Sequence, residues 1–174
     1  PSGVKFLTIP TGIVSTDCEF VVECEYEDSG TITHFSDSYE NAQWVYLTLH
    51  DSNYHLQYVS GQNVKVNTSQ TTRPADSNAN YAYQWAFVGN PISGFSIMNR
   101  AAGSGYILSS PAVNTASNTG GSTFPVMTDI NAIPAGNNKY WTAYNYGAGF
   151  TLAREGETVK LNNRNGVLSY WTGT

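Results

Sequence analysis

The sequence predicts an all-β protein in which three similar units close into a pseudo-threefold barrel. Its apolar runs are short and are bounded by Gly, Pro and Asn, which supply the backbone angles of tight turns. No stretch shows helical periodicity longer than two turns. Three segments, spaced by about 50 residues, repeat the order strand, turn, strand, and closing such units into a barrel removes most free strand edges. These segments are Tyr46–Val59, Phe95–Leu108 and Phe150–Leu161.

The first 43 residues differ from the rest, and we expect an N-terminal β extension over 1–43 and a barrel domain over 44–174. Val4–Ile9 alternates like a strand, Cys18–Tyr26 is a second candidate, and Thr31–Phe35 is a weaker third. The third barrel unit is one strand short at its C-terminal end. We therefore expect Val4–Ile9 or Cys18–Tyr26 to pack on the barrel or to complete it.

The strands of the barrel domain follow from apolar runs and the turn residues between them. The hairpin signal Asn-Gly at 165–166 precedes the last strand, and the polar stretches 67–80 and 109–123 are expected to be loops. In chain order the expected strands are Trp44–Leu49, Tyr54–Val59, Val64–Val66, Gln84–Val88, Phe95–Met98, Tyr106–Leu108, Phe124–Met127, Tyr140–Tyr144, Gly149–Arg154, Thr158–Asn162 and Val167–Trp171.

The two cysteines, Cys18 and Cys24, lie in one strand candidate and share one of its faces. Six residues of strand span roughly 20 Å, whereas a disulfide needs Cα atoms within about 7 Å. We therefore expect two free cysteines that are buried as small apolar groups. They indicate no particular redox compartment.

The composition excludes some partners and favours others. Net charge is −5 and the eight basic residues are scattered, which argues against nucleic acid. No stretch approaches the ~18 consecutive apolar residues of a membrane span. The chain starts at Pro1, as it would after removal of an export signal or excision of a fragment. Abundant Tyr and Asn suit the recognition of neutral polar ligands.

Catalysis and metal binding have no support in the sequence. His50 and His55 can approach each other across a turn, but no third ligand stands at a zinc spacing. No nucleophile elbow and no phosphate-binding loop occurs. Glu19, Glu23 and Glu25 share a strand face, which is typical of a solvated surface rather than of acid–base chemistry. We expect no enzyme activity, no cofactor and no metal.

One stretch carries a family resemblance. Gln84 and Trp85 are the first residues of the expected strand Gln84–Val88. The turn Asn99–Gly105 follows the next strand, and Tyr106–Leu108 begins a third. This order resembles the repeat joint of ricin-type β-trefoil lectins, and the resemblance covers about residues 44–171. It implies a β-trefoil-like fold. The sugar-binding residues of that family do not carry over, because no repeat here shows the full set.

The four tryptophans are expected to divide between core and surface. The resemblance implies that Trp85 and Trp141 are core residues, and Trp44, at the start of the first strand, is expected to play the same part. Trp171 lies near the C-terminus and alternates with Tyr170. It is expected either to pack there or to offer a stacking platform for a sugar ring.

Together these features predict a non-catalytic carbohydrate-binding module of a secreted or cell-surface protein. Its partner would be a glycan or polysaccharide, and the chain can be one part of a larger multidomain protein. A structural or adhesive β domain without a small ligand, and a β-trefoil protease inhibitor, remain alternatives. Sugars are bound by ring stacking and by amide and carboxylate hydrogen bonds. The residues of those types expected to bind sugar are Asp129, Asn131, Tyr144, Asn145, Tyr146 and Trp171.

Overall fold

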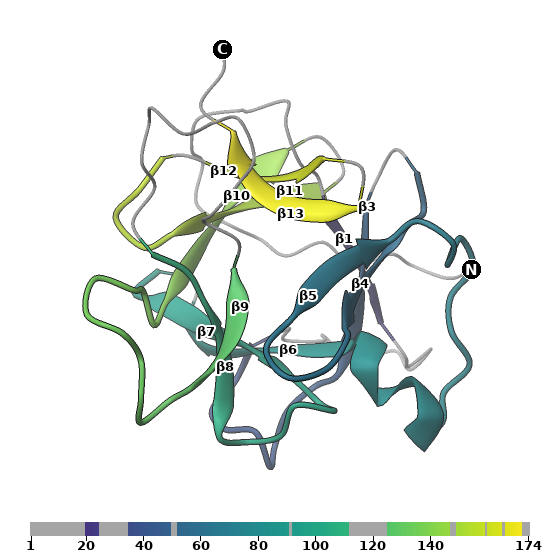
Figure 1. The fold of residues 1–174 in the computed structure, drawn as a ribbon, viewed down its shortest axis with the longest axis horizontal. Coiled ribbons are helices and arrows are strands. Elements are labelled where there is room, and N and C mark those ends of the chain that lie inside the picture. The colour runs from purple at the N-terminus through teal and green to yellow at the C-terminus, as the bar shows by residue number, and fades with distance from the viewer. Residues whose placement is uncertain are drawn as a thin grey trace.

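The protein is all-β and has almost no helix, as the computed structural model in Figure 1 shows. The structure describes residues 20–24, 35–49, 52–90, 92–111, 125–146, 149–158, 160–164 and 166–171. The strands are β1 (Phe20–Cys24), β2 (Phe35–Ser36), β3 (Val45–Leu49), β4 (His55–Tyr58), β5 (Val64–Asn67), β6 (Gln84–Asn90), β7 (Gly94–Asn99), β8 (Tyr106–Ser109), β9 (Val126–Asp129), β10 (Trp141–Tyr146), β11 (Gly149–Arg154), β12 (Lys160–Arg164) and β13 (Val167–Trp171). A short 3-10 helix, η1 (Asn78–Tyr83), precedes β6.

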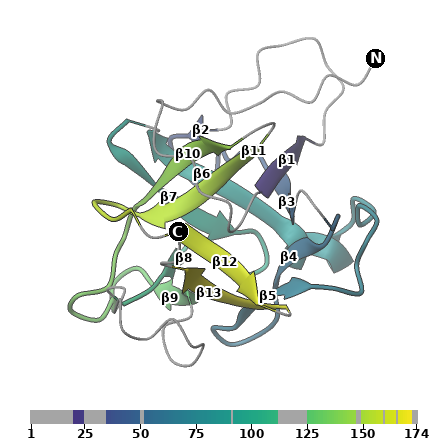
Figure 2. The ribbon, with the colours of Figure 1, turned by 90° about the horizontal axis from the view of Figure 1, so that it is seen from above.

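Six strands form a nearly closed, barrel-like sheet. Antiparallel pairs run from β1 to β3, β6, β7, β10 and β11, and from β11 back to β1. The ring is thin at two joints, where Phe95 pairs with Trp141 and Phe20 pairs with Phe150. In Figure 2, β1 lies between β11 and β3. A strand from the first 43 residues thus joins the first and last parts of the ring.

Three hairpins stand beside this ring: β4–β5, β8–β9 and β12–β13. The backbone amide of Val66 in β5 donates to the carbonyl of Gly166, in the turn before β13, at 3.1 Å. The amide of Met127 in β9 donates to the carbonyl of Gln62, in the turn between β4 and β5, at 2.9 Å. These bonds tie hairpins from distant parts of the chain together.

Two tryptophans anchor the core in the same way. Trp85 and Trp141 are fully buried, which confirms the expectation for both. The indole Nε1–H of Trp85 donates to the carbonyl of Leu56 at 3.0 Å, and that of Trp141 donates to the carbonyl of Leu108 at 2.8 Å. Each bond joins the start of a ring strand to the first strand of a hairpin. It also satisfies a polar group that burial would otherwise leave unpaired.

The N-terminal predictions are only partly within the described residues. Within the candidate Cys18–Tyr26 the structure has β1. Val4–Ile9 and the cysteine side chains lie outside the described residues. The weak candidate Thr31–Phe35 is described only from Phe35, which begins a two-residue strand that pairs with β6 in the parallel sense. None of the helices in the described part of the chain is long and apolar enough to cross a membrane.

A glycine at the start of β7 is a sensitive point of this sheet. Gly94 has a φ of +93°, and a Cβ there would lie 3.0 Å from Cβ of Tyr140. We expect Gly94→Ala to lower the free energy of unfolding by about 1–2 kcal/mol, because it adds crowding to backbone strain. Gly103 has a φ of +90° with no atom within 4 Å of such a Cβ. Gly103→Ala should therefore cost less, about 0.5–1 kcal/mol. Urea titrations measure the free energy of unfolding of both variants. Equal losses of stability would show that the Tyr140 side chain moves aside for the added Cβ without a cost.

Candidate functional site

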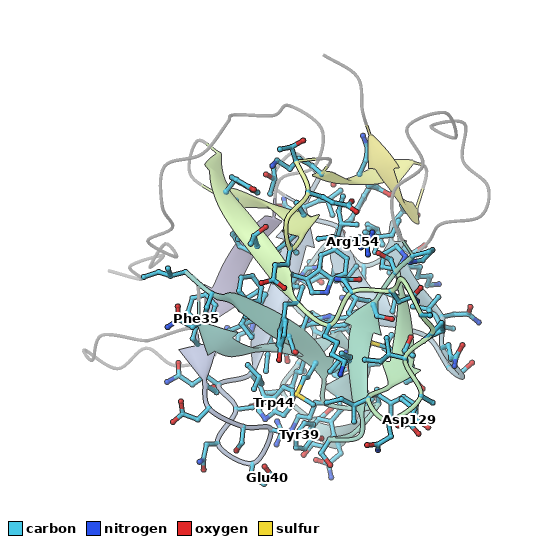
Figure 3. The ribbon with its side chains drawn as sticks, turned by 90° about the vertical axis from the view of Figure 1, so that its left-hand side faces the viewer. Phe35, Tyr39, Glu40, Trp44, Asp129 and Arg154 are labelled. Atoms are coloured by element: carbon cyan, nitrogen blue, oxygen red, sulfur yellow. The ribbon has the colours of Figure 1, made fainter. Side chains whose placement is uncertain are left out.

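Two of the residues expected to bind sugar lie in one turn after β9. The Asp129 carboxylate accepts the backbone amide of Asn131 at 2.8 Å, so one of its oxygens shapes the turn. Across the hairpin, Asp129 stands opposite Tyr106, whose side chain is 37% exposed. Asn131 is exposed. This turn, whose Asp129 is labelled in Figure 3, therefore has exposed polar groups close to one partly exposed aromatic side chain.

The other predicted residues lie in the larger sheet. Lys160 places its Nζ 3.2 Å from the centroid of the Tyr144 ring, and the Tyr144 hydroxyl donates to the carbonyl of Glu157 at 3.5 Å. The face of Tyr144 is therefore covered by a cation. Asn145 and Tyr146 in β10, and Trp171 in β13, are placed by their backbones, and their side chains lie outside the described residues. No described contact joins Tyr144 to Asp129.

A different set of side chains forms a cluster at the surface, which we call the Trp44 cluster: Tyr39, Trp44, Tyr81 and Arg100. All four are half-buried. The Arg100 guanidinium lies 4.0 Å from the centroid of the Tyr81 ring and 5.5 Å from that of Trp44. The rings of Tyr39 and Trp44 meet edge to face at 5.0 Å. Figure 3 shows Tyr39 and Trp44 near each other, with Glu40 beyond them.

Buried polar groups hold the Trp44 cluster in place. Arg100 Nη1 donates to Oε1 of Gln84 at 2.7 Å, and the Arg100 amide donates to the Gln84 carbonyl at 2.9 Å. The Gln84 side chain is fully buried, and its Nε2 donates to the hydroxyl of Tyr46 and to Oδ1 of Asp76. Because Gln84 is fixed on both sides, it fixes the guanidinium that it accepts from.

The turn beside Arg100 is equally constrained. Asn99 is fully buried, and its Nδ2 donates to the carbonyls of Ala82 and Gln84. Its Oδ1 accepts the amide of Ala101 at 3.0 Å. A side chain with both ends engaged has little freedom, so Arg100 emerges from a rigid turn. The Asn-Arg turn of the sequence thus positions a cation beside aromatic rings.

Tyr39 closes the cluster from the other side. Its hydroxyl donates to the carbonyl of Arg100 at 2.9 Å. Burial raises the pKa of Tyr39, and the nearby charge of Arg100 opposes that shift. The hydroxyl therefore keeps its proton and its donor role throughout the neutral range.

The expectation that Trp44 is a core residue is wrong. Trp44 is only half-buried, whereas its neighbour Val45 is buried and pairs with Trp85. The residues from Val45 to Thr48 are all buried, so β3 is covered on both faces, and Trp44 lies just before this buried stretch. Nothing in the sequence pattern placed Arg100 next to Trp44.

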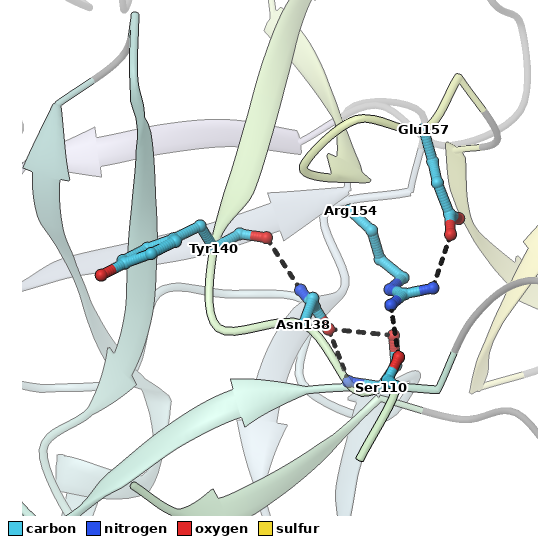
Figure 4. A network of polar contacts seen from close by, with 6 residues as sticks. Ser110, Asn138, Tyr140, Arg154 and Glu157 are labelled. Carbon is cyan, nitrogen blue, oxygen red and sulfur yellow. Dashed lines mark hydrogen bonds and ion pairs between the residues drawn. The ribbon is translucent and has the colours of Figure 1, made fainter. Parts of the chain in front are cut away.

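A second polar network lies away from the Trp44 cluster (Figure 4). Asn138 accepts the amide of Ser110 at 2.8 Å and donates to the carbonyl of Tyr140 at 2.9 Å. Arg154 pairs with Glu157 and donates to the carbonyl of Gly136 at 2.8 Å. These bonds satisfy loop backbone, and Arg154 is nearly buried. The network therefore holds connections in place, and its one unpaired donor, Nε of Arg154, is buried.

Neither metal ligands nor similarity to known proteins indicates a function for this chain. Within the ranges that the structure describes, no three His, Cys, Asp or Glu side chains gather as metal ligands would. A scan against protein-family models finds no match, and searches of curated proteins and of solved structures find none either. The function must therefore be inferred from the Trp44 cluster itself.

Proposed function

We propose that this chain folds as a β-trefoil-like domain and binds carbohydrate through the Trp44 cluster. The support for the fold is the ring of six strands, the three hairpins beside it, and the repeated Trp85–Leu56 and Trp141–Leu108 bonds. These are the parts that three similar units would contribute. On this proposal, β1 supplies the fourth strand of the third unit.

The observation that carries the binding function is the half-buried indole of Trp44, which meets Tyr39 edge to face and has Cζ of Arg100 over its ring at 5.5 Å. Large aromatic rings are usually buried, so a rigidly held indole at the surface is suited to recognition. A sugar ring stacks its C–H face on an aromatic ring, and fixed polar groups nearby select its hydroxyls. The cluster has both, and no group in it is arranged for bond cleavage. The proposed role is a non-catalytic glycan-binding module of a secreted or cell-surface protein.

The proposal predicts the effect of removing the indole. We expect Trp44→Ala to weaken glycan binding at least about tenfold, since it removes the stacking platform. Glycan-array screening of the whole chain identifies a ligand, and isothermal titration of that ligand against both proteins measures the change. The matched control is Tyr140→Ala, because Tyr140 is 45% exposed and lies outside the cluster. It should bind as tightly as the parent.

Two outcomes would contradict the proposal. Silence of the parent protein across neutral, acidic and sulfated glycans would favour a structural or adhesive β domain. Loss of binding in Tyr106→Ala, with Trp44→Ala unaffected, would move the site to the turn that carries Asp129 and Asn131. Thermal unfolding of each variant checks that lost binding does not reflect lost fold.

A further inference from the structure

Four polar groups of the Trp44 cluster have no hydrogen-bond partner among the described residues. They are Nε and Nη2 of Arg100, the indole N–H of Trp44 and the hydroxyl of Tyr81. In the same part of the chain, the side-chain polar atoms that are both buried and unpaired belong to other residues. The four groups are therefore open to solvent, and each of them can donate a hydrogen bond.

The guanidinium of Arg100 presents one complete edge to a ligand. Its Nη1 is bonded to Oε1 of Gln84, an amide oxygen, which leaves the positive charge uncompensated. Nε and Nη2 lie side by side on the remaining edge, at a spacing that matches two oxygens of one anion. Within the described ranges no carboxylate forms an ion pair with Arg100. The cation therefore has a free fork and no acidic partner.

Arg100 is held in place before any ligand arrives. Its guanidinium lies 4.0 Å from the centroid of the Tyr81 ring and 5.5 Å from that of Trp44. Gln84 fixes Nη1, and Asn99 fixes the turn from which the side chain emerges. A long side chain that is already ordered loses less freedom when it binds. A ligand on the free edge of the guanidinium needs no open ring face.

Arg154 shows how a structural arginine of the same fold differs. Its guanidinium is nearly buried, pairs with the carboxylate of Glu157 and donates a second bond to the carbonyl of Gly136. Its Nε is buried without a partner. The donors of Arg154 are thus used or enclosed, whereas Arg100 keeps two that are accessible.

We infer that the Trp44 cluster binds a tetrahedral oxoanion, a sulfate or phosphate group, on the Nε–Nη2 edge of Arg100. Two oxygens of the group accept from the fork. Its further oxygens accept from the unpaired donors of Trp44 and Tyr81, whose rings border the same guanidinium. A carboxylate has no third oxygen for them. This inference does not require carbohydrate binding, and a sulfated or phosphorylated sugar would satisfy both proposals.

Acidic residues near the cluster limit its affinity. Glu40 is exposed and follows Tyr39 directly, and Asp76 is exposed and accepts from Gln84. The chain as a whole carries −5, so attraction depends on the fixed arginine and not on a general positive field. We therefore expect millimolar affinity for the free ion. Glu40→Gln should tighten it about twofold, because it removes a repulsive charge.

The test follows the indole N–H resonance of Trp44 in the full chain while sodium sulfate is added. Sodium chloride at the same ionic strength is the reference, because it screens charges without presenting oxygens. We expect a saturable shift with sulfate and with inorganic phosphate, and about fivefold weaker binding of acetate, which lacks the further oxygens. Methyl sulfate and methyl phosphate then show which ester the site takes.

Variants locate the anion. Arg100→Met should abolish the saturable shift, and Arg100→Lys, which keeps the charge and loses the fork, should bind about tenfold more weakly. Tyr81→Phe keeps the ring under the guanidinium and removes one donor, so it should bind about fivefold more weakly. Lys139→Met removes an exposed charge outside the cluster and should bind like the parent. Thermal unfolding checks that each variant is folded.

The contrary results separate this inference from the proposed function. Equal shifts in chloride and sulfate, or a sulfate response that survives in Arg100→Met, would overturn the inference and leave carbohydrate binding standing. Acetate that binds as tightly as sulfate would overturn the assignment to a tetrahedral group. A protein that binds sulfate but no glycan, sulfated glycans included, would retain the inference and lose the proposed function.

Discussion

Trp141→Ala is expected to lower the free energy of unfolding by about 4 kcal/mol, within the range for buried Trp. Trp141 is fully buried, and its pairing with Phe95 is the joint between β7 and β10. The substitution leaves a cavity at one of the two thin joints of the ring. It also leaves the carbonyl of Leu108 without the indole donor. Urea denaturation followed by far-ultraviolet circular dichroism measures the loss.

Two further variants separate packing from hydrogen bonding. Trp141→Phe keeps most of the apolar contact and removes the Nε1–H, so it should cost about 2 kcal/mol. Trp85→Ala should resemble Trp141→Ala, because Trp85 makes the corresponding bond to Leu56. A cost below about 1 kcal/mol for Trp141→Ala would show that the core closes over the space and that this joint does not stabilise the ring.

Lys160→Met is expected to raise the free energy of unfolding at pH 7 by about 2 kcal/mol. The Lys160 side chain is 2% exposed, and Nζ has no hydrogen-bond partner. Burial lowers the pKa of this ammonium from 10.5 to about 8. Methionine keeps the apolar length over the Tyr144 ring and removes the buried charge, at the loss of a cation–π contact worth about 1 kcal/mol.

The pH dependence gives the sharper readout. A lysine with a lowered pKa in the folded state destabilises the protein fully below pH 8, where both states carry the proton. The penalty is relieved as pH rises from 8 towards 10.5, because there the unfolded chain binds more protons than the folded one. The advantage of Lys160→Met over the parent should shrink across that window.

An exposed lysine in another strand is the control for this prediction. Lys65 in β5 is exposed, so Lys65→Met should change stability by less than about 0.5 kcal/mol at either pH. Denaturant titrations at pH 7 and pH 9.5 compare the three proteins. A Lys160→Met variant less stable than the parent at pH 7 would show that the contact with Tyr144 outweighs the cost of burying the charge.

The local pattern of this chain predicted its strands well where apolar runs are bounded by turn residues. β6 and β7 cover the apolar runs on both sides of Pro91 with boundaries that differ by one or two residues. The region that precedes β6 was expected to be loop, yet Asn78–Tyr83 forms a 3-10 helix. So short a helix is stabilised by the contacts around it. Its sequence therefore does not need the helical periodicity by which longer helices are predicted, and it shows none.

The sequence did not point to the Trp44 cluster. Residue type alone pointed to Asp129, Asn131 and Tyr144, because amides, acids and aromatic rings suit sugars. In the structure Asp129 shapes its own turn, and the ring of Tyr144 lies under Lys160. Both roles depend on which residues become neighbours in space. A single sequence does not specify those neighbours.

Alternation and turn chemistry act over a few residues, so the all-β class, strand positions and the burial of Trp85 and Trp141 could be predicted from the chain. Long-range pairing decided the rest. β1 lies between β11 and β3, residues far apart in the chain. Trp44 lies just before the buried part of β3, and Arg100 meets it because Gln84, held from two sides, accepts the guanidinium. A surface site depends on contacts between distant segments, and these form only when the barrel closes.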